Sequence, residues 1–144
     1  MSEMSPRFTF LFTPLEAVGH FNASIGIAQQ LLSRGHKIVF ATPNSWRGKL
    51  EPLGFIEEPT QDPQDDVDTE KWGAIVSAMK PALKLSAFEQ MQTMQFFMVK
   101  ELIHKAKTGD QRFREIMAVV KPDVVVIDFM AQNPALMNQG KVQN

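Results

Sequence analysis

The stretch Phe8-Thr-Phe-Leu-Phe-Thr13, together with Lys37-Ile-Val-Phe-Ala-Thr42, decides the fold of this chain. Residues 8–13 are apolar with little polar alternation, which is typical of a strand buried on both faces. Between the two segments, apolar residues repeat on one helical face: Ile25, Ala28, Leu31 and Leu32. Asn22 is expected to cap this helix, and Gly35 follows its end as a C′ glycine. The stretch therefore predicts a βαβ unit with two parallel strands.

Further elements follow in alternating order. Ser45 is expected to cap a short helix through Leu50, and Phe55-Ile-Glu57 is a candidate third strand. Later helices are expected at 70–79, 82–107 and 110–120, with Pro81 and Gly109-Asp110 as the boundaries. Val124-Val-Val-Ile127 is typical of a second fully buried strand, with a helix after Asp128. The order predicts an α/β fold, a doubly wound, Rossmann-like parallel sheet.

Composition limits the class of protein. The 144 residues suffice for a single domain, and the hydrophobic content of 44% is ordinary for a globular protein. The net charge of −1 gives no electrostatic reason to expect nucleic acid or an anionic membrane as a partner. Cysteine is absent, so disulfides and thiolate metal sites are excluded. The apolar run Phe8–Phe12 is too short to span a bilayer, and a cytoplasmic location is expected.

Two side chains with catalytic potential are expected at the same edge of the sheet. His20 comes just after the first strand, and Asp128 stands at the carboxyl end of the last one. Ligands of open α/β sheets bind outside the carboxyl ends of the strands. If the two strands are neighbours, the carboxylate could orient the imidazole as a general base for a hydroxyl nucleophile. The alternative is that each residue merely caps its own turn.

Two segments in the middle of the chain each allow two interpretations. Residues 57–70 are rich in carboxylates and prolines, which favours a solvated acidic loop over a cation site. Between Met79 and Met98 the chain concentrates methionine and phenylalanine. These residues could pack a helix on the sheet, or form a pliable wall of an apolar ligand pocket.

The other candidate sites are weak. His36 is expected to be a turn residue, and His104 to be solvated on a charged helix face. No pair of histidines has metal-ligand spacing, so no metal is expected. The glycine-rich phosphate loops of dinucleotide-binding and ATP-binding proteins are absent. A dinucleotide bound by this domain alone is therefore disfavoured, as is a flavodoxin-like nucleotide protein.

The motifs resemble a known family. The Gly19-His20 loop, the helix ending in Arg34-Gly-His36 and the strand ending in Ala41-Thr42 are similar to the amino-terminal half of UDP-dependent glycosyltransferases of the GT-B fold. The segment Lys121-Pro-Asp-Val-Val-Val-Ile-Asp128 resembles a later motif of the same family. The resemblance covers most of 8–58 and 120–136. One departure is Ala23, where the family often has proline.

The resemblance implies a mechanism and a set of site residues. His20 would deprotonate the acceptor hydroxyl, and Asp128 would orient the His20 ring and balance its charge. The reaction would be the inverting transfer of a hexose from a UDP-sugar, without a metal or resident cofactor. The acceptor would be a small lipophilic molecule with a hydroxyl. The residues expected to bind it are Leu15, Val18, Gly19, Phe21, Met94, Met98, Phe129 and Met130.

The family also has a second domain that binds the UDP-sugar, and its signature is absent from this sequence. We therefore expect residues 1–144 to be one incomplete acceptor-binding domain that has no transferase activity alone. The alternative is a non-catalytic module that binds an apolar ligand or a partner chain. Self-association through an exposed sheet edge is a further expectation, because unpaired edge strands are adhesive.

Overall fold

A four-stranded parallel sheet forms the centre of the computed structural model, which describes residues 6–62, 64, 77, 79–130, 133 and 135. Its strands are β1 (Thr9–Thr13), β2 (Lys37–Thr42), β3 (Ile56–Pro59) and β4 (Val124–Ile127). They lie in the order β3-β2-β1-β4, and all three pairings are parallel. The predicted α/β class with a parallel sheet is confirmed, including β1 beside β2.

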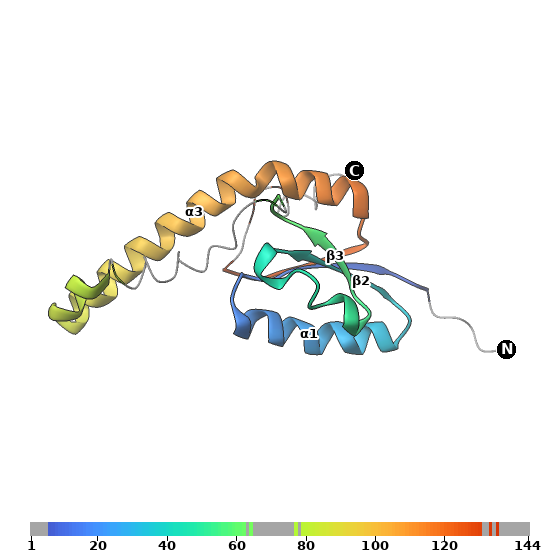
Figure 1. Ribbon diagram of the computed structural model, residues 1–144, viewed down its shortest axis with the longest axis horizontal. Helices are drawn as coiled ribbons and strands as arrows, with labels where there is room; N and C mark the ends of the chain where they lie inside the picture. Colours follow the sequence, from blue (N-terminus) through green and yellow to red (C-terminus); the bar gives the residue numbers. More distant parts are fainter. Residues whose placement is uncertain are drawn as a thin grey trace.

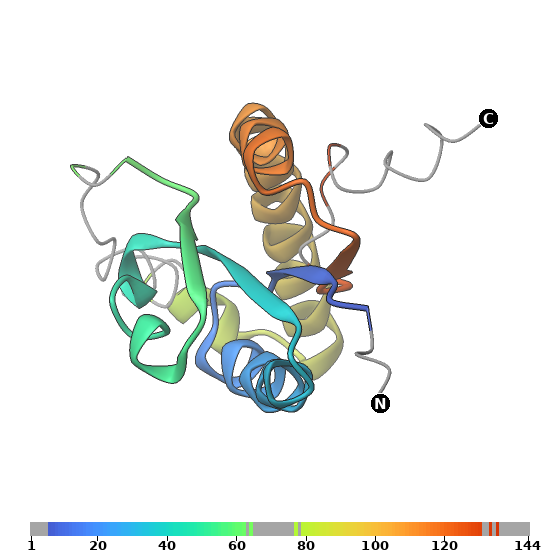
Figure 2. The same cartoon turned by 90° about the vertical axis from the view of Figure 1, so that its right-hand side faces the viewer.

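Helices cover both faces of the sheet, which makes three layers. Helix α1 (Val18–Ser33) lies on one face, and the carboxyl-terminal half of α3 (Ala87–Val120) lies on the other (Figures 1 and 2). Alternate strand residues point to opposite faces. Phe12, Ile38 and Phe40 pack under α1, whereas Leu11 and Val39 pack with Ile116 under α3. This alternation explains why the middle residues of the two central strands are apolar on both faces.

Helix α1 begins earlier than the sequence suggested. Its N-cap is Ala17, which makes no side-chain cap, and Asn22 lies inside the helix. His20 therefore belongs to the first turn of α1 rather than to the preceding loop. The end of the helix is as expected, because Gly35 adopts a φ of 89° after the C-cap Arg34. That left-handed conformation favours glycine.

The predicted break in the long helix is wrong. Helix α3 runs without interruption through Gly109-Asp110, and it starts at Ala87 rather than at residue 82. Ser86 accounts for the start, because its hydroxyl accepts the N–H of Glu89 while the Glu89 carboxylate accepts the N–H of Ser86. Pro81 instead lies in the short 3₁₀ helix η3 (Lys80–Lys84). Residues 70–76 and 78 of the expected helix 70–79 lie outside the described residues.

The segment between β2 and β3 also differs in detail. Two 3₁₀ turns, η1 (Asn44–Trp46) and η2 (Glu51–Leu53), replace the helix expected after Ser45. The candidate third strand Phe55-Ile-Glu57 is confirmed in part, because β3 starts at Ile56 and extends to Pro59, into the expected acidic loop. Glu57 belongs to β3, as predicted. Its carboxylate accepts the N–H groups of Gly48, Leu50 and Glu51. Glu57 thus has a structural role, because it satisfies backbone donors of the turn.

Strand β4 is less buried than predicted. Val124 is exposed and the remaining residues are half-buried. β4 is at the end of the sheet order, so it pairs on one side only within the described residues. The helix expected after Asp128 falls mostly outside them.

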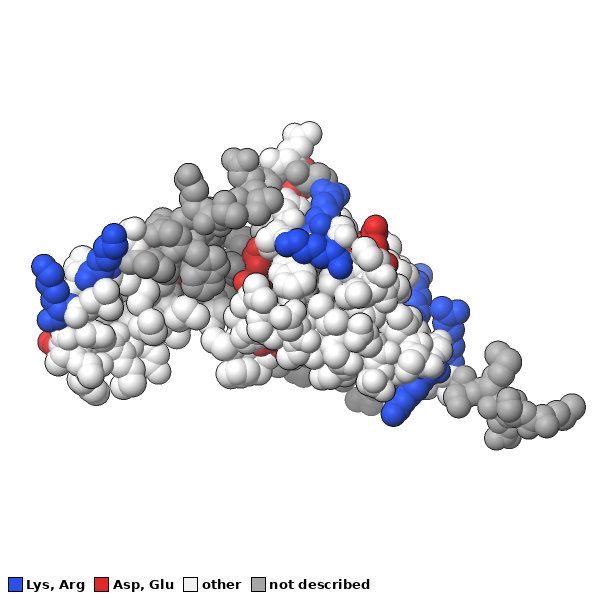
Figure 3. All heavy atoms as spheres, turned by 60° about the horizontal axis from the view of Figure 1, so that its bottom comes forward, with Lys and Arg blue, Asp and Glu red and all other residues white. Residues whose placement is uncertain are grey.

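Charged groups are dispersed on the face shown in Figure 3, where Lys and Arg atoms and Asp and Glu atoms form separate small groups between uncharged areas. Apart from a run of Lys and Arg atoms at its right-hand end, this face has no continuous patch of one sign.

Candidate active site

The sheet order places His20 and Asp128 at one crevice. The chain leaves β1 toward β2 on one side and later returns through α3 to β4 on the other side. The point between β1 and β4 is therefore a topological switch point, where open α/β sheets bind ligands. Asp128 follows β4 directly, and His20 lies in the first turn of the helix that follows β1.

The two side chains are hydrogen-bonded. Nδ1 of His20 lies 2.5 Å from Oδ2 of Asp128. The His20 side chain is 35% exposed and the Asp128 side chain 13% exposed. The pair is thus anchored on the side of the carboxylate and reaches solvent on the side of the imidazole. This juxtaposition is the one expected from the sequence; the catalytic roles stay predictions.

Backbone donors fix the carboxylate. The N–H of Met130 donates to Oδ1 of Asp128 at 2.9 Å, and the N–H of Leu15 donates to Oδ2 at 3.3 Å. Burial raises the pKa of Asp128, but the hydrogen bonds from Met130, His20 and Leu15 together outweigh it. The pKa of Asp128 is therefore lowered, and the group is an anion at neutral pH.

The anionic partner determines the tautomer of His20. A carboxylate only accepts hydrogen bonds, so Nδ1 of His20 must carry the proton in this contact. In the neutral ring, Nε2 then has the free lone pair of an acceptor. Within the described part of the chain, His20 Nε2 has no hydrogen-bond partner. The arrangement is chemically suited to take a proton from a hydroxyl placed against Nε2.

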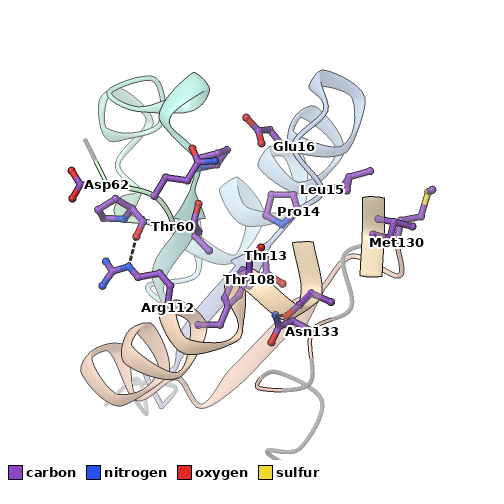
Figure 4. A pocket seen from close by; sticks show the side chains of 18 residues that line it. Thr13, Pro14, Leu15, Glu16, Thr60, Asp62, Thr108, Arg112, Met130 and Asn133 are labelled. Carbon is purple, nitrogen blue, oxygen red and sulfur yellow. Dashed lines mark hydrogen bonds between the residues drawn. The ribbon is translucent and has the colours of Figure 1, made fainter. Parts of the chain in front are cut away.

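A cavity of about 740 Å³ adjoins this pair at the carboxyl ends of β1, β2 and β3, with one wall formed by α3 (Figure 4). Leu15 and Met130 lie on one side of it, and Asp62 and Arg112 on the opposite side. His20 and Asp128 are not in its lining. However, Leu15 and Met130 are the residues whose N–H groups bind Asp128, so the cavity lies next to the pair.

Only part of the predicted acceptor-binding set reaches the cavity. Leu15 and Met130 line it, whereas Val18 and Gly19 are exposed at the start of α1. Phe129 is 79% exposed outside the lining. Met94 and Met98 lie on α3 before the part that borders the cavity.

Phe21 is a correction, because it is fully buried in the core beneath α1. Its ring stacks on Trp46 at 4.3 Å between centroids and on Phe40 at 6.2 Å. An acceptor cannot contact this side chain, so Phe21 belongs to the core rather than to the site.

Several cavity residues were missed from the sequence. They are Thr13, Thr60, Leu102, Ala106, Arg112, Phe113 and Asn133. Thr60 could have been found, because it directly follows β3 and parallel strands end at one edge. Arg112 and Phe113 could not, because the helix was expected to break before them at Gly109.

Hydrogen bonds tie the walls of the cavity together. Nε of Arg112 donates to the carbonyl oxygen of Pro59 at 2.7 Å, which joins α3 to the end of β3. The buried Asn133 donates from Nδ2 to the carbonyl oxygen of Ala106 at 2.9 Å. The Ser45 hydroxyl donates to Glu16 at 2.8 Å. These contacts join the segments that form the walls of the cavity.

The other histidines lie outside this site. His36 accepts the N–H of Phe8 through Nδ1, and its ring packs against Phe8 and Phe10. His104 is exposed on α3. Across the described ranges, no group of three His, Asp or Glu side chains could hold a metal ion. No helix among those residues is long and apolar enough to cross a membrane.

A comparison with known proteins finds a distant relative. The chain is 34% identical over 62 residues to 4'-demethylrebeccamycin synthase of Lentzea aerocolonigenes, a glycosyltransferase. The match covers 43% of this chain and 14% of the relative. No family model matches the chain. The match and the parallel α/β sheet together fit a glycosyltransferase.

Proposed function

We propose that this chain is the acceptor-activating part of a UDP-sugar-dependent glycosyltransferase of the GT-B type. The hydrogen bond between His20 and Asp128 at the switch point carries the proposal. The likeness to a glycosyltransferase of known activity supports the same reaction class.

In the proposed reaction, Nε2 of His20 removes the proton of an acceptor hydroxyl. The oxygen attacks the anomeric carbon of the sugar as the bond to the UDP oxygen breaks, so the configuration inverts. Asp128 stabilises the imidazolium that forms, because its carboxylate is already ionised and hydrogen-bonded. The proton passes from His20 to solvent, and UDP leaves as the anion.

The acceptor is proposed to be a small lipophilic molecule that carries a hydroxyl. The cavity beside the pair is large enough for a drug-sized ligand, and Leu102, Phe113 and Met130 contribute apolar surface to it. We further propose that a separate domain holds the UDP-sugar, since the sequence has no phosphate-binding loop.

The test is turnover with a phenolic acceptor and UDP-glucose, measured for the chain alone and after supplying a glycosyltransferase donor domain. We expect turnover only with the donor domain. His20→Ala should then lower kcat by about 10²–10⁴-fold, which is the range for loss of a general base.

His104→Ala is the matched control, because this histidine is exposed on α3 and lies outside the cavity. It should leave kcat unchanged. Turnover retained in His20→Ala would remove His20 from the mechanism, and turnover by the chain alone would refute the need for a second domain.

The cavity favours a second candidate, a non-catalytic module that binds an apolar ligand. Calorimetric titration of the chain with a hydroxylated aromatic compound, without any nucleotide, measures this function. Binding that Leu102→Asn abolishes, combined with no turnover in any donor-domain complex, would favour the module over the enzyme.

A further inference from the structure

The first half of α3 projects beyond the sheet (Figure 1). Large apolar side chains of this part of the helix are exposed. We refer to Ala87–Val99 as the α3 arm. Phe96 is 76% exposed, Phe88 63% and Met91 56%; Met94 and Val99 are exposed as well. A contiguous apolar surface of this kind on a soluble protein marks an interaction site.

The side of α3 that packs on the sheet and the exposed side of the arm are different sides of the helix. Val120, Ile116 and Phe113 pack in the layer between α3 and the sheet, and Ile116 is buried there. Steps of three or four residues lead from them along the same side of the helix. The positions reached are Gly109, Ala106, Leu102, Met98, Gln95 and Met91. The exposed residues of the arm follow a neighbouring side of the helix, reached by steps of three or four residues: Phe88, Gln92, Phe96 and Val99. Glu89 and Lys100 lie beside this exposed stripe.

Beyond Glu89, the arm also lacks charged residues. From Gln90 to Val99 no residue is charged, and Glu89 and Lys100 flank the run. Ten helical residues extend over about 15 Å, so a second helix can cover them. A membrane-surface helix would instead carry a lysine- and arginine-rich polar face, which this run does not have.

The positions of the two flanking charges favour one partner. In an antiparallel pair of identical helices centred between Met94 and Gln95, Glu89 of each copy meets Lys100 of the other. The charges are then complementary at both ends, and the apolar run faces itself. A parallel pair would place like charges together at both ends, which is unfavourable.

We propose that the α3 arm is a homodimer interface, formed by antiparallel packing of the arms of two copies of this chain. This interface differs from an association through the edge of β4. It is also independent of the catalytic proposal, since neither His20 nor Asp128 lies on the arm.

Sedimentation velocity of the full chain over a concentration series tests the proposal. We expect a dimer whose dissociation constant rises at least tenfold in Phe96→Lys, because a charge replaces the most exposed aromatic side chain of the arm. Val119→Lys is the matched control. Val119 is also apolar and is 72% exposed, on the opposite end of the same helix, and its substitution should leave the dimer unchanged.

Disulfide trapping tests the orientation, because the chain has no native cysteine to interfere. Gln95→Cys lies beside the centre of the antiparallel pair and should form an intermolecular disulfide. Val99→Cys should not, since its counterpart in the other copy is displaced by about 13 Å along the helix. Trapping of both variants would indicate a parallel pair and overturn the antiparallel arrangement.

A monomer at every attainable concentration would overturn the proposal. A dimer unaffected by Phe96→Lys would also overturn it and would favour an interface at the exposed edge strand β4. Circular dichroism of both lysine variants confirms that α3 remains helical, which is expected at exposed positions.

Discussion

Asp128 connects three parts of the site through a single carboxylate. It accepts hydrogen bonds from the His20 ring, from the loop after β1 at Leu15 and from the turn after β4 at Met130. The sequence predicted the pairing of His20 with Asp128, because both follow strands that end at one edge. It could not predict the backbone donors, since these depend on the conformation of two turns.

The lowered pKa of Asp128 makes stability depend on pH in a defined direction. The unfolded chain binds a proton near the ordinary value of 3.8, whereas the folded chain binds it only at lower pH. The contribution is therefore present above that value and is lost as the pH falls through the folded pKa. The wild type should lose more unfolding free energy than Asp128→Asn in denaturant titrations below pH 3.8.

Glu101→Gln is the control for this titration, because Glu101 lies on α3 and accepts no hydrogen bond within the described residues. The unfolding free energy of Glu101→Gln should change with pH in the same way as that of the wild type. Parallel stability curves for the wild type and Asp128→Asn would contradict the hydrogen-bonded carboxylate.

Phe21 shows why the residue type and its place in the sequence were insufficient to predict the acceptor-binding residues. It lies next to His20 in sequence and was expected in the acceptor site, but a helix directs neighbouring residues to different sides. Phe21→Ala should lower the unfolding free energy by about 3–5 kcal/mol in denaturant melts, as for other buried aromatic residues. Phe129→Ala, at an exposed phenylalanine, should change it by less than about 0.5 kcal/mol. Equal effects would place Phe21 outside the core.

Elements with strong patterns were predicted best. β1, β2 and α1 follow from runs of apolar residues and from Gly35, whereas α3 was divided at Gly109 because glycine weakens a helix. Packing against the sheet overrides that preference, since Phe113 and Ile116 follow within two turns. The 3₁₀ turns η1 and η2 were missed, because the Glu57 carboxylate that stabilises η2 comes later in sequence.

The end of α3 offers a stability test at the scale of an element. Lys121 caps the helix with a φ of 46°, a left-handed conformation that a side chain disfavours. Lys121→Gly should raise the midpoint of thermal unfolding, by up to about 1 kcal/mol in free energy. Lys107→Gly, within the same helix, should lower stability by about 1 kcal/mol. A destabilised Lys121→Gly would refute the strained cap.

At the scale of the whole molecule, the order β3-β2-β1-β4 brings distant segments together at one crevice. α1 contributes His20 to the pair, the turn directly after β4 contributes Asp128, and α3 forms a wall of the adjoining cavity. The position of the crevice was predictable from the alternation of strands and helices. The projection of the α3 arm was not, because its apolar pattern is the same whether the sheet or another copy covers it.

The central claim is that this architecture holds His20 in the tautomer of a general base. Nitrogen-15 NMR of the histidine rings, assigned with His→Gln variants at a pH where the rings are neutral, measures it directly on the chain. Asp128 should place the His20 proton on Nδ1, whereas His36 should carry its proton on Nε2, because its Nδ1 accepts the N–H of Phe8. We predict opposite tautomers at the two rings. We also predict that the tautomer of His20 changes in Asp128→Ala. An Nε2 proton on His20 in the wild type would contradict the account.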